Sequence, residues 1–357
     1  MVKKTLKETV LDKITRKPPA PKIRPAWKFN PDKFSDFVKK RKGKKFVIAL
    51  SAGKLKIACH LPLLKLIETL DMKVDEIWGV SAGAIVGGLW AHGIKSADIY
   101  DRLDEISIST VFDIFNTESV KSAFEAFRRE DRMKTAGIVP GIEIEKQLRT
   151  FAQNADWKNP HVESENFYAV AYNITGFHKT VLSINKESKV QHLNMETPDT
   201  FTESLSDGDL ADIMRASIAM SGIYWPKEIG GEYFLDGGIT EHLPINSPFL
   251  IWYKDVQLGH EDRDLLIVAL EAAYWTPDTP LPANAFSITS ESFEILGVEL
   301  SKAHEFYIRN HQPVKGPKVE LIIIRPEMPY TKISVMPDFN SQIKTAKKSI
   351  IKELSNK

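Results

Sequence analysis

The feature that most constrains the fold is a pattern that occurs twice within about 50 residues. The apolar run 46–50 ends at Gly53, and a helical pattern follows. A second apolar run, VDEIWGV at 74–80, leads into the helical run SAGAIVGGLWAHG. Strands that alternate with helices pair in parallel through right-handed crossovers. We therefore expect an α/β fold with a mostly parallel central sheet and helices on both faces.

The rest of the chain supplies more strands of the same kind. Five further apolar runs predict strands: FYAVAYNITG, KTVLSI, EYFLDGG, LLIVALEA and KVELIIIRP. Residues 97–155 look helical, with a break at 137–141, and form either a lid or part of the core. The predicted sheet is therefore large.

A serine stands at the second strand–helix joint. Ser81 has Gly79 and Gly83 two residues away on either side, and small flanking residues permit a sharp turn. The helix that starts there places its N-terminal dipole and the N–H of Ala82 beside the serine, where both favour developing negative charge. Chance alone gives such a GxSxG roughly once in ten to twenty chains of this length, but its place at a joint favours a nucleophile.

A candidate base lies at the end of a later predicted strand. The run YFLDGG delivers Asp236 into a turn formed by Gly237 and Gly238, and such a turn allows a carboxylate to approach another backbone closely. A Ser–His–Asp esterase would instead need a late histidine. His304 and His311 are available, but both fall in a predicted amphipathic helix.

Several segments together carry a family resemblance. GVSAG at 79–83, AYNITG, RASIAMSGIYWP at 215–226, LDGG at 235–238 and the following HLP resemble patatin-like phospholipases in order and spacing, over about residues 46–250. The resemblance implies a three-layer α/β/α fold with a nucleophile elbow. It also implies a Ser81–Asp236 dyad that hydrolyses phospholipids or other acyl-ester lipids without a histidine, a metal or another cofactor.

The same resemblance locates an oxyanion loop after the first strand. In ALSAGKLKIACHLPLL, Lys56 and His60 stand at the family's usual basic and histidine positions. The implied oxyanion donors are the N–H groups of Gly53, Lys54 and Ala82. Three positions where glycine is typical hold other residues, namely Ala52, Lys54 and Ile57. A non-glycine residue costs about 1 kcal/mol or more where the loop needs positive φ. A second hypothesis is therefore a catalytically weakened patatin-fold protein that binds lipid or a partner.

Two other interpretations of this loop are weaker. The run AGK is similar to a phosphate-binding loop, but Ile48 stands where that motif needs glycine and Leu55 where it needs serine or threonine. Cys59 and His60 are expected to be packing residues, since no metal-spaced companion accompanies them. As the single cysteine, Cys59 cannot form an intramolecular disulfide, which fits a reducing compartment.

Charge divides the chain unevenly. Residues 1–45 hold 16 Lys/Arg against 4 Asp/Glu, whereas the remainder holds 32 against 43. We expect 1–45 to be a basic, proline-containing arm, 46–330 the catalytic domain and 331–357 a helical tail. The arm suits a solvated linker, contact with an anionic membrane or folding back onto the acidic body; we expect no nucleic-acid partner. In the membrane alternative, the side chains that insert at the interface are Trp27, Phe29, Phe34 and Phe37. Without a signal-like or membrane-spanning run, we expect a cytoplasmic or peripheral membrane protein of undetermined oligomeric state.

Overall fold

A computed structural model describes residues 27–104, 137–153, 161–162, 166–185, 187, 189–195, 203–272, 285–328 and 337–356. Residues 1–26 of the predicted arm lie outside these ranges, as do 105–136, the middle of the segment expected to be a lid or core.

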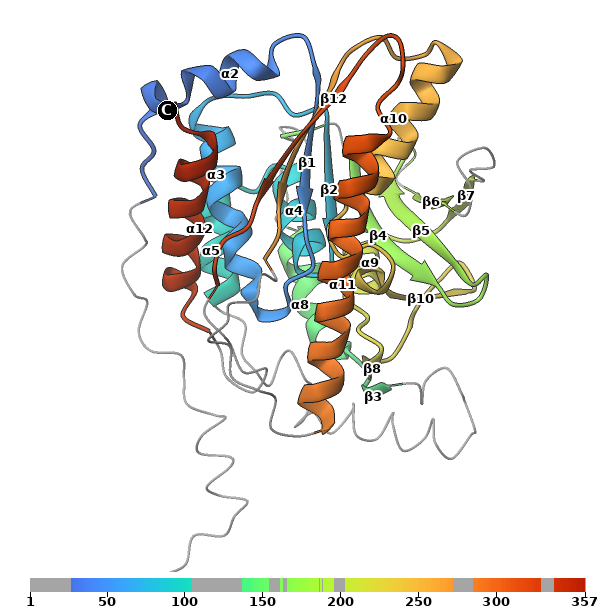
Figure 1. Cartoon of the computed structure of the whole chain (residues 1–357). Coiled ribbons are helices and arrows are strands. Elements are labelled where there is room, and N and C mark those ends of the chain that lie inside the picture. The colour runs from blue at the N-terminus through green and yellow to red at the C-terminus, as the bar shows by residue number, and fades with distance from the viewer. Residues whose placement is uncertain are drawn as a thin grey trace, which may run out of the picture.

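A mixed sheet organises the described residues (Figure 1). Its main strands run in the order β12-β11-β1-β2-β4-β5-β6-β7. Their bounds are β1 (Lys45–Leu50), β2 (Glu76–Val80), β4 (Phe167–Asn173), β5 (His178–Ile184), β6 (Val190–Asn194), β7 (Glu203–Ser206), β11 (Leu265–Leu270) and β12 (Val319–Ile324). Neighbouring strands are parallel from β12 to β4 and antiparallel from β4 to β7. The expected α/β class is confirmed, and the apolar runs predicted as strands are strands.

Four short strands lie outside this order. They are β3 (Gly137–Val139), β8 (Gly222–Tyr224), β9 (Lys227–Ile229) and β10 (Glu232–Asp236). β3 and β8 form a separate parallel pair, while β10 pairs with β9 and with β4. Residues 167–170 of β4 pair with β2, and residues 171–173 pair with β10. β10 therefore follows β2 along the same side of β4.

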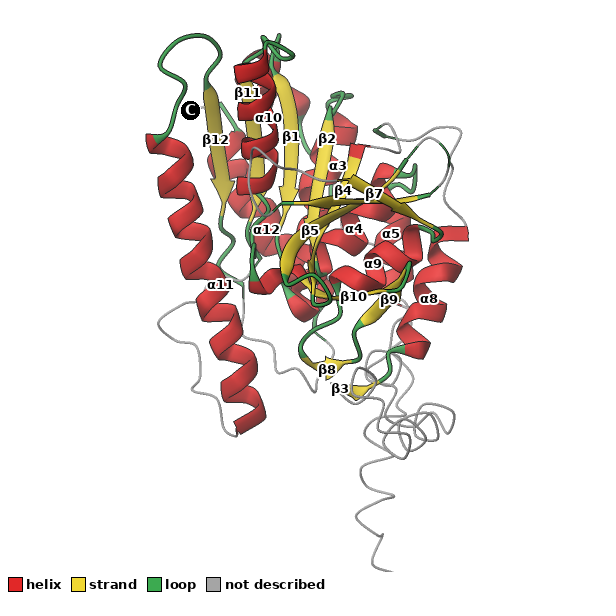
Figure 2. Cartoon of the chain, turned by 90° about the vertical axis from the view of Figure 1, so that its right-hand side faces the viewer, coloured by secondary structure: helices red, strands yellow, loops and turns green. Residues whose placement is uncertain are grey.

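Helices cover both faces of the sheet (Figures 1 and 2). They are α2 (Ser35–Arg41), α3 (Leu61–Thr69), α4 (Ala82–Ala91), α5 (Ser96–Asp104), α8 (Ile142–Gln153), α9 (Leu210–Ser217), α10 (Asn246–Leu258), α11 (Ala285–Asn310) and α12 (Phe339–Leu354), with short 3₁₀ turns η1 (Pro31–Phe34), η2 (Lys54–His60) and η4 (Gly237–Ile239). The side chains of β1 alternate between two cores. Phe46, Ile48 and Leu50 pack with α3, α4 and α12, whereas Val47 and Ala49 pack with α10. These two cores establish the three layers.

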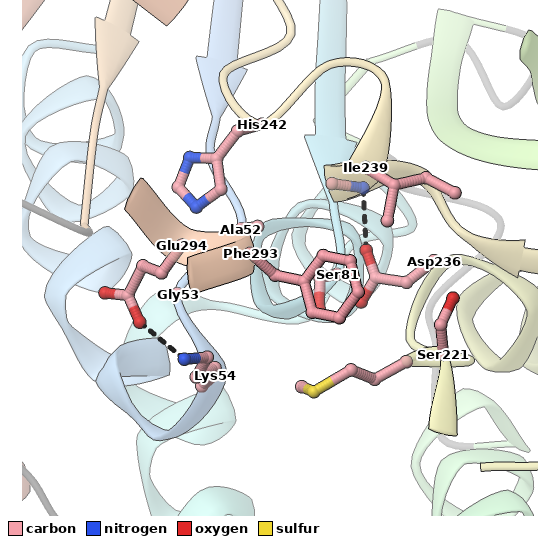
Figure 3. A pocket seen from close by; sticks show the side chains of 12 residues that line it. Ala52, Gly53, Lys54, Ser81, Ser221, Asp236, Ile239, His242, Phe293 and Glu294 are labelled. Atoms are coloured by element: carbon pink, nitrogen blue, oxygen red, sulfur yellow. Dashed lines mark hydrogen bonds and ion pairs between the residues drawn. The ribbon is translucent and has the colours of Figure 1, made fainter. Parts of the chain in front are cut away.

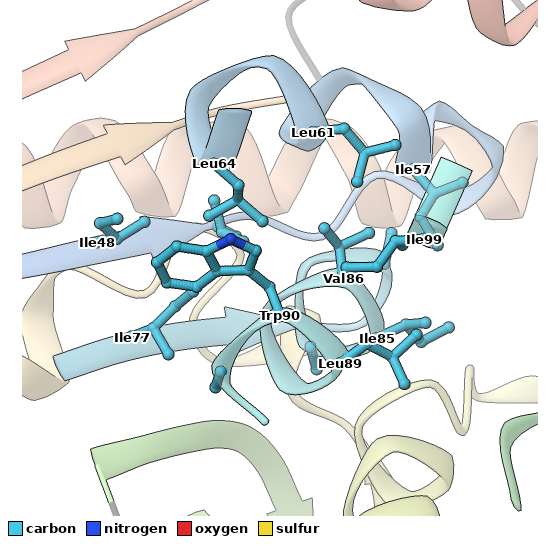
Figure 4. Packing of buried hydrophobic residues seen from close by; sticks show 14 of the residues in the cluster. Ile48, Ile57, Leu61, Leu64, Ile77, Ile85, Val86, Leu89, Trp90 and Ile99 are labelled. Carbon is cyan, nitrogen blue, oxygen red and sulfur yellow. The ribbon is translucent and has the colours of Figure 1, made fainter. Parts of the chain in front are cut away.

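The helix after Ser81 is buried all round. Every residue of α4 is buried, because the helix lies between the sheet and its neighbouring helices (Figure 4). Trp90 packs there with aliphatic side chains, and its indole N–H donates to Glu68 over 3.0 Å. Small residues let the helix approach the sheet: a Cβ on Gly88 would lie 3.0 Å from Phe167. The packing of α4 thus fixes the position of Ser81 at the N-terminal end of this helix.

The described part of the predicted arm is folded into the body. The aromatic side chains expected to insert at an interface are Trp27, Phe29, Phe34 and Phe37, and none is more than 7% exposed. They belong to the same core as α3, α4 and α12. That expectation is wrong, because the protein's own apolar core already covers these rings.

Basic side chains of the same segment pair with acidic groups of the body. Lys40 and Lys44 both contact Glu320, at 2.8 and 2.6 Å. Lys45 contacts Glu76 at 2.6 Å. Folding back, one of the alternatives left open by the sequence, is therefore what residues 27–45 do.

The C-terminal helix is also part of the fold. The helix expected within 331–357 is α12, whose apolar face (Phe339, Ile343, Ala346, Ile350 and Leu354) is buried. Its Gln342 accepts a hydrogen bond from the N–H of Ala58 and donates one to the carbonyl of Leu55. The predicted tail thus contacts the loop after β1. Within the described ranges, we find no helix with the length and apolar character needed to span a membrane.

Candidate active site

The turn between β2 and α4 is strained at the serine. Ser81 has φ +52° and ψ −117°, a conformation that side-chain-bearing residues rarely adopt. Its N–H donates to the hydroxyl of Ser217 over 3.0 Å, and that hydroxyl donates to the carbonyl of Val170 over 2.7 Å. A rare conformation persists only where its surroundings hold it, and it marks candidate functional sites.

The flanking glycines are required by close backbone contacts. A Cβ on Gly83 would lie 2.2 Å from the carbonyl oxygen of Leu50, and one on Gly79 would lie 2.6 Å from the Cα of Ala84. The N–H of Gly83 also donates to the carbonyl of Ser51. Any side chain at either position would push α4 away from β1 or β2. The spacing seen in the sequence therefore has a steric cause.

Strand pairing brings the aspartate to the serine. Val80 is paired with Val170, and Asp236 is paired with the next residue of β4, Ala171. Ser81 and Asp236 thus leave the sheet at neighbouring positions. Gly237 allows this approach, because a Cβ there would lie 2.3 Å from the carbonyl oxygen of Val170.

The carboxylate of Asp236 is buried, and its pKa is close to neutral pH. Burial raises its pKa to about 6, although hydrogen bonds from the Gly238 N–H and the Ser81 hydroxyl and the charge of Lys54 each lower it. The Gly238 N–H donates to Oδ1 over 2.8 Å (Figure 3). A carboxylate with a pKa just below neutral pH can accept a proton and later return it.

The loop after β1 forms the opposite wall of the site. The N–H of Ala52 donates to the carbonyl of His242 over 2.9 Å, so it is already engaged. Gly53 has φ −167°, an extended conformation open to any residue. Lys54 has φ +51°, in the left-handed region. Of the three altered glycine positions, Lys54 alone adopts positive φ.

Backbone donors remain for a negatively charged oxygen. Within the described ranges, no acceptor is paired with the N–H of Gly53. Ala82 is the first residue of α4, and the N–H groups of a first helical turn lack intrahelical partners. Gly53, Lys54 and Ser81 all line one pocket. The structure therefore brings Gly53 and Lys54 to the pocket of Ser81, and Ala82 follows the serine directly in the chain.

The pocket itself is small and has an apolar rim. It measures about 50 Å³ and is lined by Ala52, Gly53, Lys54, Ser81, Met220, Ser221, Asp236, Gly238, Ile239, His242, Phe293 and Glu294 (Figure 3). Ile239 and Phe293 are also exposed. The mouth thus presents apolar side chains to solvent next to the serine.

Six pocket residues were not singled out from the sequence. They are Met220, Ser221, Ile239, His242, Phe293 and Glu294. His242 belongs to the HLP segment that carried the resemblance, which was a usable signal. Burial lowers its pKa to about 4, so the ring is neutral at pH 7. Glu294 and Phe293 lie on α11, far along the chain, and no local pattern points to them.

The late histidines do not meet the serine. Neither His304 nor His311 lines the pocket of Ser81. His304 lies near Glu241 and Lys179, and His311 stacks on Tyr307. Cys59 and His60 are fully buried in the core, as expected of packing residues.

A Ser–His–Glu line does exist elsewhere. The Nε2 of His192 lies 2.6 Å from the hydroxyl of Ser206, and its Nδ1 lies 3.2 Å from Glu232. These residues join β6, β7 and β10, and none of them lines the pocket of Ser81. Among the residues that the structure describes, no group of three His, Cys, Asp or Glu side chains is placed to hold a metal ion.

Comparisons with known proteins give concordant matches. A family model described as patatin-like phospholipase matches residues 48–249. The chain is 24% identical over 208 residues to lysophospholipase NTE1 of Saccharomyces cerevisiae, covering 57% of this chain and 10% of that protein. It is 24% identical over 248 residues to lysophospholipase NTE1 of Kluyveromyces lactis, covering 68% and 14%. The chain thus spans only about a tenth of the length of these relatives.

Two solved structures are also similar. VipD from Legionella pneumophila shares 14% identity, with a TM-score of 0.40 and coverage of 87% of this chain and 67% of that one. The type III effector protein ExoU shares 11% identity, with a TM-score of 0.34 and coverage of 87% and 53%.

Proposed function

Since the chain belongs to the patatin-like phospholipase family, we propose that it is a serine hydrolase that cleaves acyl esters of lipids through Ser81 and Asp236. The observation that supports this most is their juxtaposition. A serine in a strained turn and a buried aspartate whose pKa is about 6 line the same pocket, which has an apolar rim.

In the first half of the proposed reaction, the Ser81 oxygen attacks the carbonyl carbon of the ester. Asp236 accepts the hydroxyl proton as the new C–O bond forms. The N–H groups of Gly53, Lys54 and Ala82 stabilise the negative charge on the carbonyl oxygen. Asp236 then gives the proton to the departing alcohol, and an acyl group remains on Ser81.

The second half releases the acyl group. Asp236 takes a proton from a water molecule, whose oxygen attacks the acyl carbon. Collapse of the tetrahedral intermediate breaks the bond to Ser81, and the proton returns from Asp236 to the serine oxygen. The products are a free fatty acid and the regenerated hydroxyl.

The walls of the pocket favour a lipid as the substrate. Exposed apolar side chains at the mouth, Ile239 and Phe293, suit an acyl chain better than a polar group. Leu296, on the same helix as Phe293, is 66% exposed. We infer a phospholipid or another acyl-ester lipid, in line with phospholipase and lysophospholipase activity.

A second candidate is a patatin-fold protein that binds lipid or a partner and turns over slowly. The observation that favours it is Lys54, a non-glycine residue at φ +51° in the loop that would hold the oxyanion. A pocket of about 50 Å³ also leaves little room for an acyl chain without movement of its walls.

Contact with an anionic membrane remains a proposal for the N-terminal segment. Residues 27–45 already pack against the rest of the fold, so residues 1–26 would make the contact with the membrane. These hold eight Lys/Arg against two Asp/Glu. Each basic residue near an anionic surface contributes about 1 kcal/mol of attraction.

A fluorophosphonate probe tests the proposed nucleophile. We expect the probe to label Ser81 in the wild-type protein, as mapped by mass spectrometry, and Ser81→Ala to abolish both labelling and ester hydrolysis with the fold retained. Ser206→Ala is the matched control, because Ser206 is the serine of the Ser–His–Glu line outside the pocket. Labelling at Ser206, or equal turnover by Ser81→Ala and wild type, would refute the assignment. Labelling of Ser81 without measurable hydrolysis would favour the second candidate.

A further inference from the structure

We propose that Glu294 of α11 is a positioning residue that holds the oxyanion loop in its active conformation through ion pairs with Lys54 and Lys56. The inference rests on the proposed function, because it assigns the loop a part in that reaction. It concerns a residue outside the segment matched by the family model, which ends at residue 249.

The loop needs an external constraint because of Lys54. A side-chain-bearing residue in the left-handed region costs roughly 1–2 kcal/mol relative to its relaxed conformation. At φ +51°, the backbone of Lys54 would therefore relax to another conformation if nothing held it, and this would rotate the peptide N–H groups on either side of it. Oxyanion donors must stay directed at one point, so the loop's function depends on what resists that rotation.

Glu294, on the other side of the pocket, holds the loop against that rotation. Its two carboxylate oxygens bind different lysines. One lies 2.7 Å from the Nζ of Lys54 (Figure 3), and the other lies 2.6 Å from the Nζ of Lys56. The side chain of Glu294 is only 4% exposed, and those of the two lysines are at most 19% exposed. Paired charges in a buried setting are held more firmly than surface pairs, because water competes less for them.

The charge of Glu294 is fixed by the same contacts. Burial alone would raise the pKa of Glu294, but the charges of Lys56 and Lys54 outweigh it and lower the pKa to about 2. The carboxylate therefore stays ionised wherever Asp236 is ionised. Glu291, one turn earlier, also lies near Lys54, at 3.9 Å.

The helix that carries Glu294 is itself held close to the loop. Gly297 lies one turn further along α11, and a Cβ there would be 2.6 Å from the His242 ring. The carbonyl of His242 accepts the N–H of Ala52 at the start of the loop. Contacts thus run from the loop through His242 to α11 and back through Glu294 to Lys54. This closed path lets a single side chain on α11 set the loop geometry.

The test measures Glu294→Gln in the wild-type and the Lys54→Gly backgrounds and compares it with a control variant, Glu299→Gln. Glu294→Gln keeps the shape and removes the charge. Lys54→Gly removes the need for a constraint, because glycine adopts positive φ freely. Glu299→Gln is the matched control, since it makes the same change in an exposed surface pair on the same helix. The readouts are kcat and KM for a short-chain ester, the pH dependence of kcat/KM, and amide hydrogen exchange of residues 51–58.

We expect Glu294→Gln to lower kcat by ~10²-fold with KM little changed, as expected for misdirected oxyanion donors. In the Lys54→Gly background the same change should cost less than ~10-fold. Hydrogen exchange of 51–58 should speed up in Glu294→Gln and stay as in wild type in Glu299→Gln. Equal losses in both backgrounds, or unchanged exchange in Glu294→Gln, would overturn the proposal.

The pH profile adds a readout that a merely structural role would not move. The groups near Asp236 are the Ser81 hydroxyl, the Gly238 N–H and Lys54, with Glu294, Glu291, Lys56 and neutral His242 behind Lys54. Removing the negative charge of Glu294 takes away the nearer of the two carboxylates that face Lys54, so the acid limb should shift to lower pH, whereas Lys54→Gly should shift it to higher pH. Shifts in the same direction would contradict the inference. Because hydrogen exchange does not depend on turnover, failure of the proposed function would appear as inactive wild type with the exchange pattern intact.

Discussion

The nucleophile turn and the oxyanion loop solve the same problem in different ways. Each places a residue with a side chain in a left-handed conformation beside the pocket, Ser81 at φ +52° and Lys54 at φ +51°. The turn is held by backbone contacts at Gly79 and Gly83, within two residues of the serine. The loop is held by a carboxylate 238 residues away from Lys56. The glycines that permit the turn thus lie close to the serine in sequence, whereas the carboxylate that holds the loop lies far from it.

The largest effect should come from removing the partner of the serine. Asp236→Asn preserves shape and removes the base, so we expect hydrolysis to fall by about 10⁴-fold, as when a carboxylate is lost from a comparable catalytic unit. Thermal unfolding should change little. The control is Asp207→Asn, an exposed aspartate. If Asp236→Asn kept more than a tenth of the wild-type rate, Asp236 would not be the base that activates Ser81.

A single added methyl group at Gly83 should disrupt the nucleophile turn. In Gly83→Ala the new Cβ meets the Leu50 carbonyl at 2.2 Å, so we expect a loss of about 1–3 kcal/mol of stability and at least ~10²-fold in rate.

Gly87→Ala on the same helix is the matched control for this change. Its Cβ would make ordinary contacts of 3.4 Å with Leu50 and 3.5 Å with Ile77, so melting and activity should be kept. Equal behaviour of the two variants would show that the close contact at Gly83 does not hold the turn.

The pH dependence of the wild-type protein should report the ionisation of Asp236, the partner of the serine in the turn. Since Asp236 must be deprotonated to accept the serine proton and has a pKa of about 6, kcat/KM should fall about tenfold per pH unit below 6 and level off above 7. The measurement is a rate profile from pH 4.5 to 8, with circular dichroism at each pH as a control for unfolding. An acid limb near pH 4 would mean that the base is an ordinary exposed carboxylate.

Restoring glycines in the loop should have a smaller effect. Ala52→Gly and Lys54→Gly together should raise kcat about fivefold, which corresponds to about 1 kcal/mol of relieved backbone strain. The structure assigns that strain to Lys54, because Ala52 is not at positive φ. Steady-state kinetics of the two single variants test this. A fall in rate for Lys54→Gly would show that its ion pairs matter more than its strain.

The smallest effect on catalysis should come from residues 1–26, which include none of the residues assigned to the turn or the loop. Deleting residues 1–26 should leave hydrolysis of a soluble ester unchanged and weaken flotation with anionic vesicles, the more so at low salt, where charge attraction is strongest. A deletion to residue 42 is unsuitable, because it removes the buried rings of Trp27, Phe29, Phe34 and Phe37. Flotation that is equal with and without residues 1–26 would exclude the membrane role.

The sequence predicted what depends on short-range pattern. The parallel strands, the joint at Ser81 and the turn at Asp236 were visible because each combines an apolar run with glycines within a few residues. The antiparallel strands β6 and β7 were not predicted, since VQHLN and ESLS contain few apolar residues and form no apolar run. The sequence left open whether the four aromatic residues of the arm insert into a membrane or fold back, because an apolar side chain does not specify which apolar surface covers it; the structure places them in the core.

By itself the sequence determined the fold class and a catalytic hypothesis for Ser81 and Asp236, because glycine spacing and apolar periodicity are properties of neighbouring residues. The tertiary structure alone decided that Lys54 lies at positive φ and that Glu294 binds it. It also decided that β10 continues along β4 where β2 ends, which brings Asp236 to Ser81 across 155 residues of chain. Such contacts depend on how distant elements pack, and no spacing within either element specifies the other.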